Sequence, residues 1–236
     1  MNVKLPVDSL VSSTPTTPRS TETALSADAV QISITQSNRS FAQRGAWDLL
    51  SYPTFAAVSG DVDAIANQLN TYVQSRIAEA EKSNGIELEI SADPTYISQH
   101  LVLFNLEERQ YNKGAAHGMT NYESFAFDAT TGERFDLWSQ VKPERLGAFQ
   151  QMLFEEITAQ FAGQLFDDET VKSSLQDRVT LRSFTPYIGG MKLTLNVYDY
   201  APYSEGPLEL WIDWQDFGSL LDEKSVLGQV FKSKLK

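Results

Sequence analysis

The side chains able to do chemistry are few in this chain of 236 residues. It has no cysteine and two histidines, His100 and His117. The lack of cysteine excludes disulfides, thiol nucleophiles and thiolate metal sites. The short motifs of serine hydrolases, zinc proteases, phosphate loops, dinucleotide-binding turns and EF-hands are also missing from the sequence. We therefore expect no cofactor, no metal and no enzymatic activity. A pair of catalytic carboxylates from distant positions stays open, because it would leave no local mark.

Aromatic side chains gather instead in one predicted loop, residues 197–207, which reads Val-Tyr-Asp-Tyr-Ala-Pro-Tyr-Ser-Glu-Gly-Pro. Two prolines and a glycine leave its backbone little freedom. Rigid aromatic side chains in a loop indicate either a structural corner or a recognition surface. The residues that we expect to contact a ligand or partner are Tyr198, Tyr200, Pro202, Tyr203 and Glu205.

A second candidate is His117, which lies in a Gly-Ala-Ala-His-Gly segment. Its ring could bond to a neighbouring carbonyl or face a ligand, and both readings stay open. His100 shares strand parity with Val102 and Phe104, which favours a structural role. The acidic run 167–169 is typical of a helix start rather than a cation site. For Trp211 and Trp214 we expect the core.

Two amphipathic helices are predicted to support these segments. Apolar residues spaced by three and four predict a helix from Asp61 to Lys82, with Asp61 as N-cap and Asn84-Gly85 as the stop. A second helix follows Pro143 and ends near Gly163. A short helix over 168–175, a helical turn over 216–221 and a loosely docked C-terminal helix complete the set.

Strand patterns lie between the helices. Strands are expected over 30–34, 86–90, 96–106, through 125–127, 179–184, 191–198 and 208–214, and the segment 47–55 is aromatic but interrupted by Pro53. The turn 128–133 is a strong hairpin signal. Long helices separated by runs of hairpins predict an α+β fold, with a mostly antiparallel sheet packed on one face by the two longer helices.

Composition bounds the partners and the compartment. The net charge of −12 disfavours nucleic acid and anionic membranes and would attract a basic partner. The sequence contains no apolar run long enough for a transmembrane helix. Between Ser9 and Ser26, 12 of 18 residues are Ser, Thr or Pro, which predicts a disordered tether over residues 1–28. An ordinary flexible tail would have the same composition.

Several of these motifs together resemble a known bacterial family. Tyr52-Pro53, the turn 111–118 with its Ala-His-Gly, the hairpin 127–132 and the pattern Tyr-x-x-Ala-Pro-Tyr-x-x-Gly-Pro at 198–207 are similar to the domain of unknown function 3298. That family includes the extracytoplasmic part of the lysozyme-binding anti-sigma factor RsiV and a non-catalytic region of a peptidoglycan deacetylase. The chain departs from the pattern at Ala115, where the family often has glycine, and at residues 212–214, Ile-Asp-Trp in place of Ile-Pro-Tyr.

The resemblance implies an RsiV-like α+β module over residues 29–221, with a companion segment at 29–84, a main domain at 85–221 and a tail or helix at 222–236. It also implies a periplasmic or extracellular protein. We expect a non-enzymatic module that binds an envelope protein or glycan through the tyrosine loop and the His117 turn. A basic, lysozyme-like protein is one such partner that the resemblance implies. An enzyme acting on envelope polysaccharide and a structural spacer are the alternatives. If the two turns lie side by side they form a recognition surface; if they lie at opposite ends of the sheet, the loop is a rigid corner.

Overall fold

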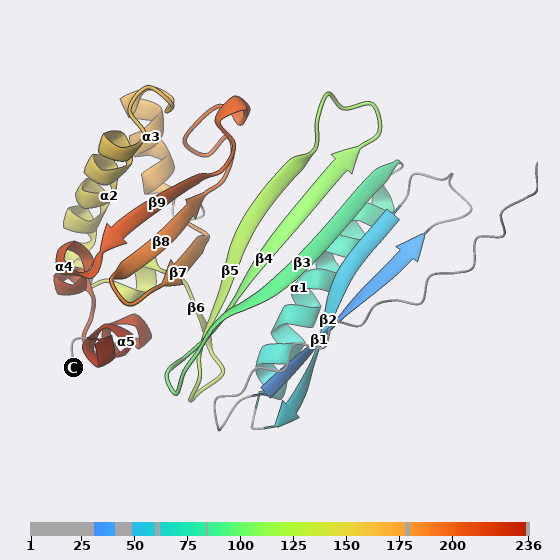
Figure 1. Ribbon diagram of the computed structural model, residues 1–236, viewed down its shortest axis with the longest axis horizontal. Coiled ribbons are helices and arrows are strands. Elements are labelled where there is room, and N and C mark those ends of the chain that lie inside the picture. Colours follow the sequence, from blue (N-terminus) through green and yellow to red (C-terminus); the bar gives the residue numbers. More distant parts are fainter. Residues whose placement is uncertain (1–30, 41–48, 60–61, 84, 178–179, 235–236) are drawn as a thin grey trace, which may run out of the picture.

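Two β-sheets, each covered by helices, form the protein in the computed structural model, which describes residues 31–40, 49–59, 62–83, 85–177 and 180–234. The six-stranded sheet has the order β1-β2-β3-β4-β5-β6 and the three-stranded sheet the order β7-β8-β9. Figure 1 shows the two halves side by side, with β5 next to β7. The predicted α+β class and the mostly antiparallel pairing are confirmed. The expectation of a single sheet was wrong, because β7–β9 pair among themselves.

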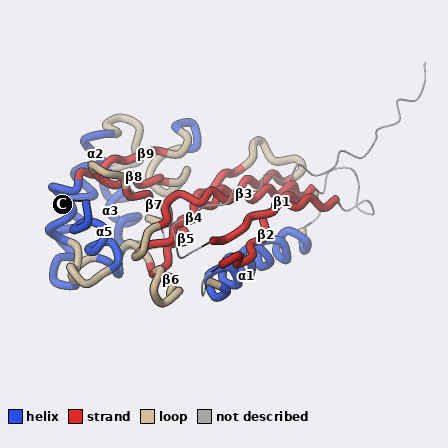
Figure 2. Tube along the Cα trace, turned by 60° about the horizontal axis from the view of Figure 1, so that its bottom comes forward, coloured by secondary structure: helices blue, strands red, loops and turns tan. Residues whose placement is uncertain are grey.

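The first half is organised by helix α1, Asp63–Lys82. Its buried face follows the predicted spacing and includes Ile65, Leu69, Val73 and Ile77. These side chains share a hydrophobic core with residues of the six-stranded sheet. Figure 2 shows α1 lying along one face of that sheet. The N-cap is Val62, without a side-chain cap bond. The predicted cap Asp61, the residue Asn84 and the whole predicted tether lie outside the described residues.

Six strands make the first sheet: β1 Gln31–Ser40, β2 Leu49–Ser59, β3 Ile86–Ile97, β4 Leu101–Asn112, β5 Met119–Asp128 and β6 Arg134–Phe135. All neighbours pair antiparallel except β2 and β3, which run parallel over residues 49–51. Pro53 lies beyond that short parallel stretch, so its missing N–H interrupts no bond to β3. Tyr96 belongs to β3, so the predicted strand 96–106 was shifted; the β3–β4 turn falls at residues 98–100.

The predicted hairpin turn after β5 is confirmed. The Asp128 N–H donates to the Glu133 carbonyl, and Gly132 has a φ of +71°, a left-handed conformation that suits glycine.

The second half of the molecule is built from helices α2 Leu146–Gln160 and α3 Asp168–Gln176 and strands β7 Ser183–Pro186, β8 Gly190–Leu195 and β9 Leu208–Asp213. Asp167 caps α3 by accepting a bond from the Thr170 N–H, as its place at a helix start predicts.

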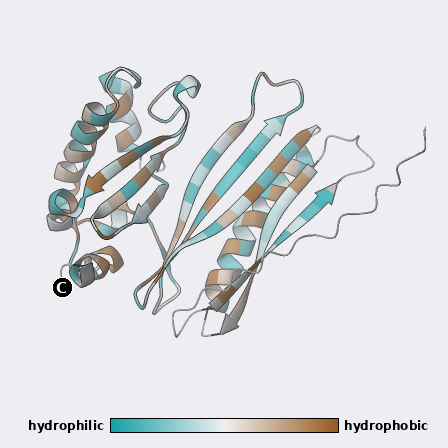
Figure 3. Ribbon diagram, viewed as in Figure 1, coloured by the Kyte–Doolittle hydropathy of each residue, from teal (hydrophilic) through white to brown (hydrophobic). Residues whose placement is uncertain are grey.

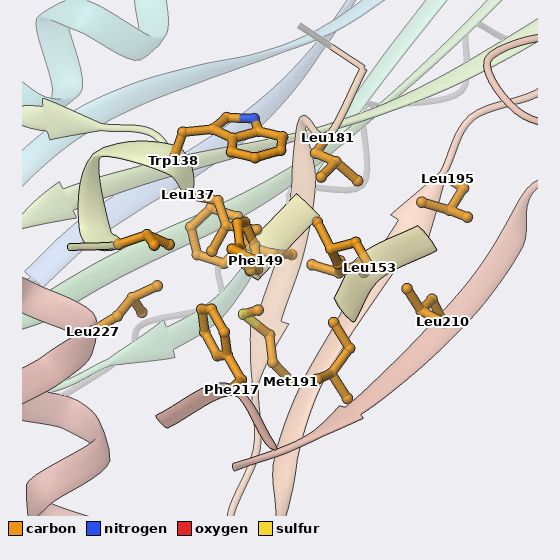
Figure 4. Packing of buried hydrophobic residues seen from close by; sticks show 14 of the residues in the cluster. Leu137, Trp138, Phe149, Leu153, Leu181, Met191, Leu195, Leu210, Phe217 and Leu227 are labelled. Carbon is orange, nitrogen blue, oxygen red and sulfur yellow. The ribbon is translucent and has the colours of Figure 1, made fainter. Parts of the chain in front are cut away.

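Helix α2 covers one face of the three-stranded sheet. Phe149 and Leu153 pack toward Met191 of β8, and all three are fully buried (Figure 4). Strand β9 alternates buried and exposed residues, which Figure 3 shows as changing hydropathy along the strand. This alternation leaves Trp211 39% exposed, so its predicted place in the core was wrong, whereas Trp214 is buried as predicted.

The chain ends in α4 Trp214–Phe217, the 3-10 turn Gly218–Leu220 and α5 Val226–Lys234. Leu227 and Val230 of α5 are buried in the second core, so this helix docks firmly rather than loosely. In the described part of the chain, no helix has the length and apolarity needed to cross a membrane. The companion segment contributes strands and α1 to the same sheet and core as the following strands, and the boundary at residue 84 stays a prediction.

Candidate binding site

The two turns singled out in the sequence meet in space. The His117 ring, in the β4–β5 turn, stacks on the Tyr203 ring with centroids 3.7 Å apart and planes inclined by 18°. Tyr203 in turn stacks on Tyr198, with centroids 5.9 Å apart. The three rings form a row, which we call the aromatic stack. His117 and Tyr198 are exposed and Tyr203 is half-buried, so the row lies at the surface.

The backbone presents Tyr198 in an unusual conformation. Its φ is +68°, a left-handed value that a residue with a bulky side chain adopts rarely and at an energetic cost. The Tyr198 N–H nevertheless bonds to the Ala201 carbonyl at 3.0 Å, which closes the tight turn. The side chain is 50% exposed. The fold therefore maintains a strained residue whose ring is directed largely into solvent.

Tyr200 anchors the same loop in the hydrophobic core. It is fully buried, and its hydroxyl lies 2.7 Å from the Thr180 Oγ1. Burial, the largest cause, raises the pKa of this hydroxyl well above its usual range. A side chain without exposed surface cannot touch a partner, so the expected contact role of Tyr200 is corrected to a structural one. Pro202 is half-buried before Tyr203, and Glu205 is exposed at the end of the 3-10 turn Tyr203–Glu205.

Asn196 fixes the loop onto the first sheet, a role that no sequence motif indicates. Strand β6 is so short that it leaves the outer edge of β5 uncovered around Tyr122. There the Tyr122 N–H donates to the Asn196 Oδ1 at 2.7 Å, and the Asn196 Nδ2 donates to the Tyr122 carbonyl at 3.1 Å. The buried carboxamide thus replaces a strand partner two residues before Tyr198.

A groove opens beside the aromatic stack, on the sheet face opposite α1. It encloses about 690 Å³ and crosses β1 to β5, with Tyr203 at one end. Its polar lining includes Asn38, Glu87, Glu89, Arg109 and Thr120. The alternation of Ile86, Leu88 and Ile90 with acidic residues predicts a wet strand face, and this was the available signal for the groove.

The charges in the groove are predominantly negative. The Arg109 Nε donates to the Glu107 Oε1 at 2.6 Å, and its Nη1 lies 4.0 Å from the Glu89 Oε2. Deeper along the same face, burial and then the charge of Glu107 raise the pKa of the Tyr122 hydroxyl. Among the described residues, no cluster of three or more potential ligands could hold a metal ion. What the arrangement offers is a half-open groove with aromatic and carboxylate contacts.

A half-buried ion pair lies at the base of the tyrosine loop. The Arg182 Nη2 is 3.8 Å from the Asp199 Oδ2, and burial, the largest cause, raises the pKa of the Asp199 carboxyl. This carboxylate is outside the groove lining. His100, the other histidine, is half-buried at the opposite β3–β4 turn, where its carbonyl accepts a bond from the Ala129 N–H. The predicted strand position of His100 was wrong, because the residue lies in the turn before β4, and the structural role of its side chain stays a prediction.

Comparison with known proteins bears on the fold. No family model and no curated protein matches the chain. Among solved structures, the chain is similar to a DUF3298 family protein from Pseudomonas aeruginosa PAO1, with a TM-score of 0.62 and 16% identity over 83% of this chain and 95% of that one. It is also similar to a member of the same family from Bacteroides fragilis NCTC 9343, with a TM-score of 0.60 and 17% identity over 91% of this chain and 100% of that one. The protein therefore has the fold of the DUF3298 structures, in agreement with the resemblance in its motifs.

Proposed function

We propose that this protein belongs to the DUF3298 family and is a non-enzymatic binding module outside the cytoplasm, which recognises an envelope protein through the aromatic stack and the adjoining groove. The observation that carries the proposal is the contact of His117 with Tyr203, which joins two turns from the two halves of the molecule at an exposed surface. Exposed, rigid aromatic rings bind partners at a small cost in conformational entropy.

Charge favours a basic partner, such as a lysozyme-like protein. The chain carries a net charge of −12, and the groove next to the stack contains Glu87 and Glu89. An acidic surface accelerates association with a basic protein at low ionic strength, and added salt screens this attraction. The family that the chain resembles includes a lysozyme-binding protein, which points to the same class of partner.

Titration calorimetry with lysozyme at low and moderate salt tests the proposal. We expect binding that weakens with salt and that is lost in the double variant His117→Ala, Tyr203→Ala. The matched control is His100→Ala, Tyr187→Ala, which removes the same two side-chain types from positions outside the stack; Tyr187 is 43% exposed. Absence of heat at micromolar concentrations would reject lysozyme, and equal binding by both double variants would reject the site.

One observation keeps the enzymatic alternative in view. Glu87 and Glu89 lie two residues apart on β3 and therefore point to the same side of the sheet, about 7 Å apart along the strand. Two carboxylates on neighbouring positions of one strand face are one way to build the acid–base pair of a glycosidase. Release of reducing ends from peptidoglycan by the wild-type protein, and its loss in Glu87→Gln, would favour the enzyme; equal traces from both proteins would exclude this pair.

A further inference from the structure

The groove contains one carboxylate that the protein leaves without a cation. Arg109 is the basic side chain of the groove lining, and its guanidinium is already directed at Glu107 and Glu89. Glu87 is half-buried, and no ion pair joins it to any residue in the described ranges. A partly desolvated carboxylate without a counter-ion favours a cationic ligand more than a fully hydrated one does.

Two aromatic side chains line the groove on the β4 and β5 side of this carboxylate. In the β3–β4 pairing Glu87 is directly opposite Tyr111, so the two side chains are neighbours on the open face. Tyr203 closes the end of the groove and is supported from behind by the His117 ring. Gly118 also lines the groove, and a Cβ there would lie 3.1 Å from the Gln110 carbonyl oxygen and 3.8 Å from the Tyr111 Cβ, so glycine suits the close approach of β5 to β4 at this point.

We propose that the groove binds an arginine side chain presented by the protein partner, with Glu87 as counter-ion and Tyr111 and Tyr203 as stacking surfaces; this inference rests on the proposed function. A planar guanidinium bonds to a carboxylate through two parallel N–H groups and stacks on aromatic rings, which a lysine ammonium does less well. The volume of about 690 Å³ is in the range of ligand sites and leaves room for residues flanking the arginine.

Three small probes test the chemistry directly. N-acetyl-arginine amide, its neutral isostere N-acetyl-citrulline amide and N-acetyl-lysine amide are titrated into the labelled protein, and the amide signals of Gly118 and Thr120 are followed by NMR. We expect the arginine probe to bind at least about fivefold more tightly than citrulline in the wild type. Equal binding of arginine and citrulline, or tighter binding of lysine, would overturn the inference.

The variant Glu87→Gln should remove the preference for arginine over citrulline while leaving the thermal midpoint unchanged. The control Glu133→Gln removes an exposed carboxylate from the β5–β6 turn, at the end of the sheet away from the groove (Figure 1), and should keep the preference. A preference that persists in Glu87→Gln would refute the role of Glu87.

Lysozyme titrations separate this inference from the proposed function. If lysozyme binding depends on Tyr203 but is the same in Glu87→Gln and Glu133→Gln, the arginine site fails and the proposed function stands. If lysozyme does not bind but the arginine probe still depends on Glu87, the proposed partner fails and the arginine site stands.

Discussion

The bond pair between Asn196 and Tyr122 offers the sharpest test of how the site is assembled. In Asn196→Ala, the Tyr122 N–H and carbonyl both lose their partner at the uncovered edge of β5. A buried backbone group without a hydrogen bond costs about 1–3 kcal/mol. The free energy of unfolding should therefore fall by about 2 kcal/mol or more, and the Tm by at least about 4 °C for a chain of this size.

Chemical denaturation followed by tryptophan fluorescence measures the loss. Thr194→Ala is the matched control, since Thr194 lies on β8 two residues before Asn196 and is half-buried; its effect should stay within about 0.5 kcal/mol. If Asn196→Ala and Thr194→Ala were equally stable, the carboxamide would not be the attachment that holds the loop on β5.

The variant Asn196→Asp checks the same reasoning through pH. One carboxylate oxygen can still accept from the Tyr122 N–H, but the other faces the Tyr122 carbonyl without a proton to donate. Burial and the carbonyl should raise the pKa of the introduced carboxyl in the folded state. Stability should then recover as the pH falls through that pKa and the carboxyl becomes a donor. A variant whose deficit relative to wild type is constant with pH would contradict this account.

Three further predictions concern the surroundings of the site. Tyr198→Asn places a residue that tolerates left-handed φ at the strained position, so stability to urea should stay equal or rise by up to about 1 kcal/mol while lysozyme binding weakens. Glu108→Ala should lower the free energy of unfolding by about 3 kcal/mol in the same assay, because Glu108 is buried and accepts bonds from the Arg76 Nε at 2.7 Å and Nη2 at 2.6 Å. The control Glu107→Ala, on the open face of the sheet, should lower it by about 1 kcal/mol or less. Burial raises the pKa of the Asp199 carboxyl in the folded state. Above this raised pKa the ionised carboxylate destabilises the folded protein, and this destabilisation disappears once the pH falls below the pKa of the carboxyl in the unfolded chain. Asp199→Asn should accordingly be more stable than wild type at pH 7 in thermal melts, and this gain should shrink toward pH 3.

Local patterns in the sequence were sufficient for most elements. The spacing of Ile65, Leu69, Val73 and Ile77 located α1, and the Asp128–Gly132 turn located the β5–β6 hairpin. The limits of the strands were less predictable. Between Tyr96 and Leu106 the sequence has no glycine or proline to mark a turn, yet β3 ends and β4 begins within this segment. The division into two sheets was not predictable, since it depends on which strand edges pair over long range.

The candidate site was predictable in its parts but not in its assembly. His117 and Tyr203 were identified from residue type and local turn chemistry, and their contact was left conditional. Tyr200 was misplaced because a loop pattern does not say which of three neighbouring tyrosines turns inward; burial against Thr180 decides it. Asn196 carried no motif at all, because its role is to satisfy the backbone of a strand far away in the sequence.

The energetics of the loop favour the proposed recognition surface over a rigid corner. The buried Tyr200 and the two Asn196 bonds are sufficient to hold the loop as a rigid corner, and neither involves the side chain of Tyr198. Such a corner gains little from a tyrosine held at a φ of +68° with half of its surface in solvent, because glycine or asparagine would adopt that φ more easily. A strained, exposed ring in a row with His117 and Tyr203 is instead what a preorganised contact surface requires, since the ordering entropy is already lost before the partner arrives. If Tyr198→Asn binds the partner as tightly as wild type, Tyr198 is not part of the contact surface, and His117, Tyr203 and the groove must carry recognition.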